Sequence, residues 1–179
     1  MTIVELIWFL LPAGIANMAP VFATKLLPKW DAAVDGGFQL FGKSLFGAHK
    51  TIRGIVFGLA AAEITFLLQR FLFEEFHGIQ RLSFINYHEL SPWFGIWFGI
   101  GALGGDLVKS FLKRRFGIKP GEPWFPFDQI DWMVGTLVVT SFIFPVGLRL
   151  SLTLLILALI LSAAAKWIGY LFYLNQRPI

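Results

Sequence analysis

Long apolar stretches separated by short polar segments run along the whole chain. About 20 apolar residues cross the hydrocarbon core of a bilayer as a helix, so the pattern predicts transmembrane helices over residues 3–23, 54–73, 92–110, 131–148 and 150–174. The first stretch carries Glu5 and no basic segment precedes it, which predicts a retained span rather than a cleaved signal peptide. We therefore expect an all-α integral membrane protein with about five transmembrane helices, folded as one membrane domain over residues 1–179.

The composition supports this class of protein. Hydrophobic residues make up 56% of the chain and charged residues 15%, and the mean hydropathy is +0.70, so polar side chains are too few to cover a soluble globule. The chain has no cysteine, which excludes disulfides and thiolate metal sites. Its histidines lack the i, i+4 spacing of a zinc-binding helix, so the sequence predicts no transition-metal chemistry.

Lysines and arginines gather in two of the predicted loops. Loop one (24–53) and loop three (109–130) hold most of them, while few lie at the opposite surface. By the positive-inside rule, both loops and the C-terminus are predicted to be cytoplasmic and the N-terminus outside. Positive charge beside membrane segments favours orientation and phosphate binding over nucleic-acid binding. The sequence therefore predicts a multi-pass protein of the cell membrane with its chemistry on the cytoplasmic side.

A charged stretch, residues 106–131, lies between two apolar runs. If the preceding run continues as a helix, polar side chains at i, i+3, i+4, i+7 and i+8 share one face: Asp106, Lys109, Ser110, Lys113 and Arg114. Asp128 and Asp131 begin the next run three residues apart, so their carboxylates also share a face. Carboxylates are hard ligands for Mg²⁺ and cations neutralise phosphates. The stretch therefore predicts a site for a magnesium–nucleotide complex.

Simpler interpretations of these residues remain open at this point. Asp128 and Asp131 follow Pro126 and suit the first turn of a helix, where acids cap it. The basic residues of both loops suit an ordinary positive-inside anchor. Gly42-Lys43-Ser44 resembles the end of a phosphate-binding Walker A loop, but its spacing is one residue short and no strand precedes it, so we reject that motif.

Further residues carry a family resemblance. Ser110-x-x-Lys113-Arg114, then Lys119, then Asp128-x-x-Asp131 resembles the signature of the CTP:phosphatidate cytidylyltransferase family, as does Gly105-Asp106-Leu107 before it. Two further segments resemble the shorter archaeal branch of this family, the CDP-archaeol synthases. One is Pro126-Phe-Asp-Gln-Ile-Asp131, and the other is loop one with Asp35-Gly36, Phe41-Gly42, Gly47 and Lys50-Thr51-x-Arg53-Gly54. Lys119-Pro120 replaces the Lys-Asp of bacterial relatives and their Pro-Gly-His-Gly-Gly run is absent, which favours an archaeal ether lipid over diacylglycerol.

The resemblance implies transfer of CMP from CTP to the phosphate of an unsaturated archaetidic acid (digeranylgeranylglyceryl phosphate), giving CDP-archaeol and pyrophosphate with Mg²⁺. The implied catalytic residues are the magnesium ligands Asp106, Asp128 and Asp131 with Lys113 and Arg114. The implied CTP or phosphate contacts are Lys43, Lys50, Thr51, Arg53, Ser110 and Lys119, with Asp31 and Asp35 as further ligands or cytosine contacts. The glycine-rich third span is expected to line a groove for the lipid chains.

Two other functions compete with this one at the level of the sequence. Glu63 lies in the middle of the second span and should face the bundle interior, where a small channel or carrier would use it in an ion path. The absence of internal repeats makes that function less attractive. A CDP-alcohol phosphotransferase would need a longer aspartate motif that this chain lacks.

Overall fold

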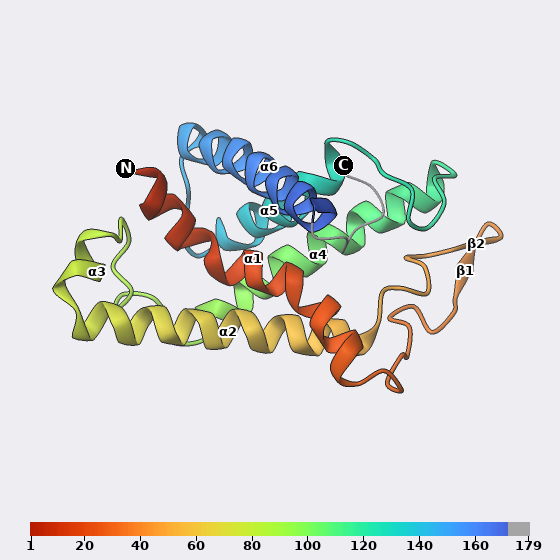
Figure 1. Ribbon diagram of the computed structural model, residues 1–179, viewed down its shortest axis with the longest axis horizontal. Coiled ribbons are helices and arrows are strands. Elements are labelled where there is room, and N and C mark those ends of the chain that lie inside the picture. Colours follow the sequence, from red (N-terminus) through yellow and green to blue (C-terminus); the bar gives the residue numbers. More distant parts are fainter. Residues whose placement is uncertain (172–179) are drawn as a thin grey trace.

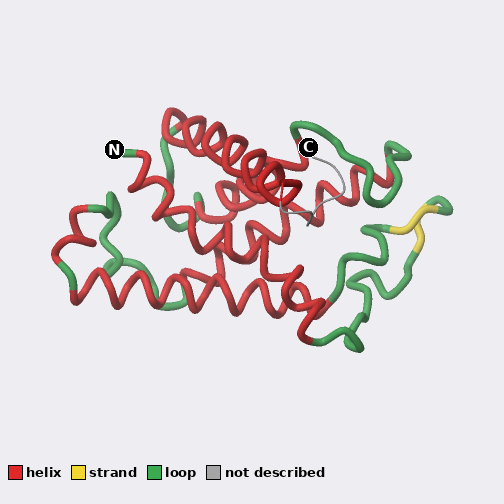
Figure 2. Tube along the Cα trace, in the orientation of Figure 1, coloured by secondary structure: helices red, strands yellow, loops and turns green. Residues whose placement is uncertain are grey.

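A computed structural model describes residues 1–171 as a helical bundle with a small β-hairpin at one end (Figures 1 and 2). The elements in chain order are α1 (Ile3–Leu26), β1 (Gln39–Leu40), β2 (Lys43–Ser44), α2 (Ile52–Glu75), α3 (His77–Arg81), α4 (Phe94–Arg115), α5 (Phe127–Thr140) and α6 (Leu148–Leu171). The predicted all-α class is confirmed, and the two-residue antiparallel strands and the short α3 are additions. The predicted end of the last span at residue 174 and the position of the C-terminus lie outside the described residues.

Three helices within residues 1–171 are long and apolar enough to cross a membrane: α1, α2 and residues Leu148–Trp167 of α6. The fourth predicted span differs most from the sequence-based bounds. Its helix, α5, begins at Phe127 and ends at Thr140, so at 1.5 Å per residue it is about 21 Å long, against a hydrocarbon core of about 30 Å. Pro145 and Gly147 explain the early end, because proline has no N–H to donate and disfavours a helical residue before it.

The predicted loop 109–130 is helical at both ends. Helix α4 continues to Arg115 and α5 starts at Phe127, which leaves residues 116–126 as the connection. The charged face predicted for residues 106–114 therefore lies on a helix, and Asp128 and Asp131 lie in the first two turns of α5.

Helix α4 is the centre of the bundle, since it packs against α1, α2 and α5. Its glycines let the antiparallel α5 approach closely. A Cβ at Gly105 would lie 2.1 Å from the carbonyl oxygen of Asp131, and one at Gly101 would lie 2.5 Å from Cα of Thr136. A Cβ at Gly135 on α5 would likewise lie 2.1 Å from the carbonyl oxygen of Gly101. The backbones thus touch along the segment that carries the charged residues, which places the start of α5 against the C-terminal half of α4.

Glu63 stabilises the other end of α4. Its Oε2 accepts a hydrogen bond of 2.9 Å from the N–H of Ile96, in the first turn of α4. Because the first N–H groups of a helix have no partner inside the helix, this carboxyl group from α2 satisfies one of them. The expectation that Glu63 faces the interior of the bundle is confirmed, since it reaches from α2 to α4.

Loop one and the C-terminal end of α4 lie at the same end of the molecule, and α3 lies at the other (Figure 1). The β1–β2 hairpin is fixed to α4 by Arg115, whose guanidinium donates to the carbonyl oxygens of Leu40, Lys43 (3.2 Å) and Ser44 (2.7 Å). The same guanidinium lies 5.1 Å from the centre of the Phe111 ring. These contacts join two segments that are more than 70 positions apart in the chain.

Candidate active site

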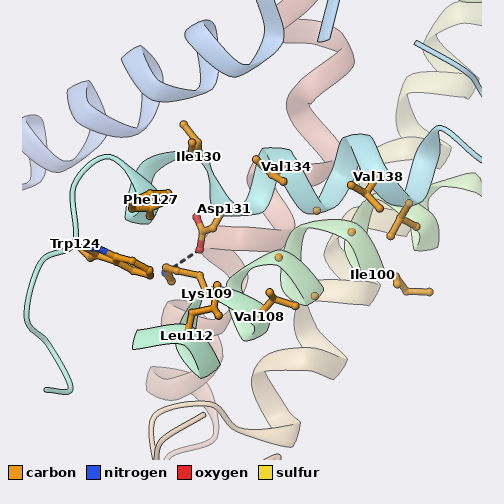
Figure 3. Close-up of a pocket in the computed structure, with 15 residues that line it drawn as sticks. Ile100, Val108, Lys109, Leu112, Trp124, Phe127, Ile130, Asp131, Val134 and Val138 are labelled. Atoms are coloured by element: carbon orange, nitrogen blue, oxygen red, sulfur yellow. Dashed lines mark ion pairs between the residues drawn. The ribbon is translucent and has the colours of Figure 1, made fainter. Parts of the chain in front are cut away.

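Three aspartates from two helices converge on one ammonium group. The Nζ of Lys109 lies 3.0 Å from Asp106 Oδ1, 3.3 Å from Asp128 Oδ1 and 2.8 Å from Asp131 Oδ2. Asp106 and Lys109 are one helical turn apart on α4, whereas Asp128 and Asp131 reach them from α5. The close packing of these helices therefore creates the cluster, and Figure 3 shows Lys109 and Asp131 pointing toward each other.

Two further lysines complete the group, which we call the aspartate–lysine cluster: Asp106, Asp128, Asp131, Lys50, Lys109 and Lys113. Lys50, from the end of loop one, pairs with Asp106 Oδ2. Lys113, one turn beyond Lys109, pairs with Asp128 Oδ2 at 3.0 Å. The cluster thus contains three carboxylates and three ammonium groups, which makes it close to neutral as a whole.

Asp128 does not cap α5. The N-cap residue, Pro126, makes no side-chain capping bond, and Asp128 Oδ2 instead accepts the N–H of Trp124 at 2.6 Å, before the helix. Burial works against ionisation of Asp128, but the charge of Lys109, the Trp124 N–H and Lys113 outweigh it, so the pKa of Asp128 is lowered. This carboxylate is therefore ionised at neutral pH. Asp128 lies in the first turn of α5, as the capping alternative has it, but no side-chain capping hydrogen bond forms at the start of this helix.

A polar pocket of about 150 Å³ opens beside the cluster. It is lined by Phe46, Gly47, His49 and Lys50 from loop one, by Lys109, Ser110, Lys113 and Arg114 from α4, and by Pro120 and Gly121. The Arg114 side chain is more than nine-tenths buried, yet its Nε has no hydrogen-bond partner among the described residues. A buried guanidinium with an unsatisfied donor is costly. It is therefore suited to an anionic ligand that supplies the acceptors.

An apolar groove of about 530 Å³ runs along α4 and α5 on the other side of the cluster (Figure 3). Side chains such as Ile100, Val108, Val134 and Val138 line its length. Lys109 and Asp131 are its charged lining residues. Lys109 lines both the groove and the polar pocket, so the two spaces meet at the aspartate–lysine cluster.

Gly104 lines the groove without taking part in helix packing. A Cβ at Gly104 would meet no atom within 4 Å, in contrast to the crowded Gly101 and Gly105 on the same helix. The missing side chain therefore keeps space open inside the groove rather than letting a helix approach.

Several loop-one residues predicted to bind phosphate have structural contacts. Arg53 is buried and donates to the carbonyl oxygen of Leu27 and to Thr24 Oγ1 (3.1 Å), which ties the start of α2 to the end of α1. Thr51 is the N-cap of α2 and accepts the N–H of Gly54 at 3.2 Å. These contacts use Nη1 and Nη2 of Arg53 and the hydroxyl of Thr51, whereas the buried Nε of Arg53 has no hydrogen-bond partner among the described residues.

Four other predicted residues lie away from the three aspartates. Asp35 accepts the N–H groups of Phe46 (3.1 Å) and Gly37 (3.0 Å), and the Phe46 hydrogen bond is the main cause of its lowered pKa. Lys43 donates to the carbonyl oxygen of Arg115 at 3.4 Å. Asp31 and Lys119 are exposed. Among the described residues, none of these four lines the polar pocket or pairs with the cluster.

The sequence-based site missed two residues that the structure places at the centre. Lys109 was placed on the charged face but was given no role, although its i+3 spacing from Asp106 marked it as a partner. His49 lines the polar pocket beside Lys50. Neither position could be assigned without knowing that α5 and loop one close on α4.

The donor chemistry of the cluster fits magnesium. Within residues 1–171, no group of three or more acidic, histidine or cysteine side chains is spaced to hold a metal ion by itself, because the three aspartates surround the Lys109 ammonium instead. Proteins usually bind Mg²⁺ through one or two carboxylates together with substrate phosphates and waters. Asp128 and Asp131, three residues apart on one helix face, can supply such a pair once phosphates are present.

Comparison with known proteins identifies the relatives of this chain. A family model described as CarS-like CDP-archaeol synthase matches residues 1–178. CDP-archaeol synthase of Thermococcus onnurineus is 34% identical over 89% of this chain and 85% of its own length, and that of Pyrobaculum aerophilum is 28% identical over 97% and 94%. A solved structure described as an intramembrane enzyme for archaeal membrane lipid biosynthesis superposes with a TM-score of 0.73 at 32% identity, covering 92% of this chain and 94% of that chain.

Proposed function

The chain belongs to the CDP-archaeol synthase family, and from this premise we propose that its aspartate–lysine cluster is the catalytic centre. The protein is a multi-pass membrane enzyme that transfers CMP from CTP to the phosphate of an unsaturated archaetidic acid (digeranylgeranylglyceryl phosphate). The products are CDP-archaeol and pyrophosphate. The observation that carries the assignment of the site is the junction of a polar pocket with an apolar groove at the cluster.

The nucleotide phosphates occupy the polar pocket in this proposal. Arg114 offers a buried guanidinium with an unsatisfied donor, and Lys50 and Lys113 supply ammonium groups at the pocket wall. Ser110 lies on the same face of α4 and adds a hydroxyl. A triphosphate carries several negative charges, and cations fixed in a partly buried pocket stabilise it more than the same cations in water.

The lipid enters from the side of the bundle. Its isoprenoid chains lie in the groove between α4 and α5, where burial of apolar surface contributes about 25 cal/mol per Å². Its phosphate then reaches the charged end of the groove, at Lys109 and Asp131. This arrangement brings the two phosphate groups together from opposite sides of the cluster.

The reaction needs no general base among the described residues. A phosphate monoester has a second pKa near 6, so the lipid phosphate is already largely ionised at neutral pH. One of its oxygens attacks the α-phosphorus of CTP, the new P–O bond forms, and the bond to the bridging oxygen of pyrophosphate breaks. Catalysis then consists of positioning and charge neutralisation. Lys50, Lys113 and Arg114 hold the phosphates, and Asp106 keeps Lys50 in place.

Magnesium bound by Asp128, Asp131 and the phosphates would neutralise charge on the leaving pyrophosphate. By the positive-inside rule, the cation-rich loops that frame the polar pocket support a site on the cytoplasmic side, where CTP is available. Both the metal dependence and this orientation are part of the proposal.

A channel or carrier is not supported. Glu63, which such a protein would use for an ion path, caps the first turn of α4 instead. The relatives reported above are synthases of a membrane lipid precursor.

The test is an assay of the purified protein with CTP, Mg²⁺ and digeranylgeranylglyceryl phosphate. We expect stoichiometric release of pyrophosphate and a CDP-lipid detected by mass spectrometry, and loss of both when Asp131 is changed to Asn. Absence of the CDP-lipid with the folded wild-type protein would contradict the activity. Equal turnover with UTP or ATP would contradict the choice of CTP.

A further inference from the structure

Lys109 differs from the other lysines of the cluster in the number of carboxylates it contacts. Its ammonium lies within 3.3 Å of all three aspartates, whereas Lys50 pairs with Asp106 and Lys113 with Asp128. Its side chain is 15% exposed and that of Asp131 is 5% exposed. Lys109 therefore occupies the point at which the three carboxylates meet.

This position conflicts with a divalent cation on the same carboxylates. An ammonium and a magnesium ion sharing Asp128 and Asp131 would lie a few ångströms apart in a partly buried site, where repulsion between like charges is strong. The cluster is already neutral with three carboxylates and three lysines. A metal ion can therefore bind well only if one ammonium leaves, and Lys109 is the one between the carboxylates.

The Lys109 side chain can also reach the two spaces beside the cluster. Its ammonium ends a flexible four-carbon chain, and the residue lines both the polar pocket and the apolar groove. In the proposed function, phosphate oxygens arrive from both of these spaces. A short movement of the side chain would exchange carboxylate partners for phosphate partners at little cost.

We propose that Lys109 is a tethered cation that holds the three carboxylates together in the nucleotide-free protein and transfers its ammonium to a phosphate oxygen when the magnesium–nucleotide complex binds. The inference rests on the proposed function of this site. It makes Lys109 a catalytic residue that couples metal binding to substrate binding, so that the carboxylates become available only when phosphates are present to receive the ammonium.

The first test measures metal binding without CTP or lipid. Mn²⁺ titrated into the purified protein and followed by electron paramagnetic resonance should bind Lys109→Met at least about tenfold more tightly than wild type, because a competing charge has been removed. Lys50→Met, which removes a lysine paired with Asp106 rather than with either proposed metal ligand, is the matched control and should change the affinity by less than about threefold. Equal Mn²⁺ affinity of wild type and Lys109→Met would overturn the proposal.

A second pair of variants keeps the test decisive if Lys109→Met does not fold. The double variant Lys109→Met/Asp131→Asn removes one cation and one carboxylate together and so keeps the cluster neutral. We expect it to bind Mn²⁺ about fivefold or more tightly than Asp131→Asn alone, since the competing ammonium is absent from the double variant. Equal affinities in this pair would also overturn the proposal.

The second test identifies the phosphate that receives the ammonium. In Lys109→Met, a CTP dissociation constant raised about tenfold at saturating Mg²⁺ would assign the nucleotide phosphate, and a KM for the lipid phosphate raised by the same factor with unchanged CTP binding would assign the lipid. Unchanged values for both would overturn the transfer step. The Mn²⁺ titration uses neither substrate, so failure of the cytidylyl-transfer assay would leave its result standing.

Discussion

The three aspartates are held in different ways, and the differences determine what each contributes. Asp128 is fixed by the Trp124 N–H as well as by Lys109 and Lys113. Asp131 has the least exposed carboxylate of the three and pairs with Lys109. Asp106 lies between Lys50 and Lys109. An amide in place of any one keeps much of the shape of the site but removes a negative charge that holds the lysines and, in the proposed function, binds the metal ion.

Asp128→Asn and Asp131→Asn should each lower turnover by about a hundredfold, which corresponds to about 3 kcal/mol of transition-state stabilisation. The free energy of unfolding should fall by only about 1–2 kcal/mol, because Lys109 keeps two of its three carboxylate partners. Turnover of CTP with the lipid phosphate and a melting curve check this. The exposed Glu75→Gln, at the opposite end of the molecule, is the control. Near-normal turnover in both folded variants would remove the aspartates from the mechanism.

The pH dependence should follow the lipid phosphate rather than Asp128. A lowered folded pKa means that Asp128 contributes stability above its unfolded pKa of about 3.9, and that this stability is lost only as the pH falls through the still lower folded value. Asp128 is therefore ionised throughout pH 5–8. We expect kcat/KM to rise through about pH 6 as the phosphate monoester loses its second proton. A lipid phosphonate, with a higher second pKa, should move this inflection upward. An unchanged inflection would assign it to the protein.

Arg115 is the residue that holds the β1–β2 hairpin of loop one against α4. The three carbonyl contacts of Arg115 fix the β1–β2 hairpin to α4, and loop one then supplies His49 and Lys50 to the polar pocket. We therefore expect the position of the hairpin to affect how well the proposed nucleotide pocket forms, although its strands contribute little hydrogen bonding of their own.

Arg115→Ala should weaken CTP binding more than it slows the chemical step. Loss of charge-assisted hydrogen bonds worth about 1.5–3 kcal/mol each releases the hairpin, so we expect the KM for CTP to rise about fivefold or more while kcat stays within about twofold. Lys at this position should restore little, because it lacks the planar fork that reaches several carbonyls. Arg81→Ala, an exposed arginine in α3, is the matched control. A fall in kcat with unchanged KM would contradict this role.

Substitutions at Gly104 and Gly101 should distinguish the effect of groove width on lipid binding from the effect of helix packing on stability. Gly104→Leu places a side chain in open groove space, so the protein should fold and bind CTP normally while the KM for the lipid rises about tenfold. Gly101→Ala meets the α5 backbone and should lower the free energy of unfolding by about 1–3 kcal/mol through overpacking. Lipid kinetics and melting curves of both variants check this. Normal lipid KM in folded Gly104→Leu would place the lipid elsewhere.

The sequence predicted those features that depend on local pattern. Helical spacing placed Asp106, Lys113 and Arg114 on one face, and the three aspartates predicted to act together do meet. The early end of α5 was missed because apolar residues continue past Thr140, whereas residues 141–144 form a turn before Pro145. Arg53 and Thr51 carried the family resemblance, but Arg53 ties α2 to α1 and Thr51 caps α2. The central place of Lys109 depends on the contact between α4 and α5, which no local pattern encodes.

Across the whole molecule, we expect the charged ends of the helices to lie at the two membrane surfaces. Loop one, the C-terminal end of α4 and the connection to α5 lie at one end, and α3 lies at the other (Figure 1). In the proposed function, the cations that bind phosphate also supply the positive-inside signal. The same residues would then determine both membrane orientation and catalysis.

This orientation can be tested in intact cells, because the native chain has no cysteine to interfere. Single cysteines at Gln39 in loop one and Pro123 before α5 should resist a membrane-impermeant thiol reagent, while one at Gln80 in α3 should react. All three positions are exposed on the protein, so a difference in labelling reports the side of the membrane. After permeabilisation all three should label, which controls for reactivity. Labelling of Gln39→Cys but not Pro123→Cys in intact cells would place the two segments on opposite sides, and the shared polar pocket could not form.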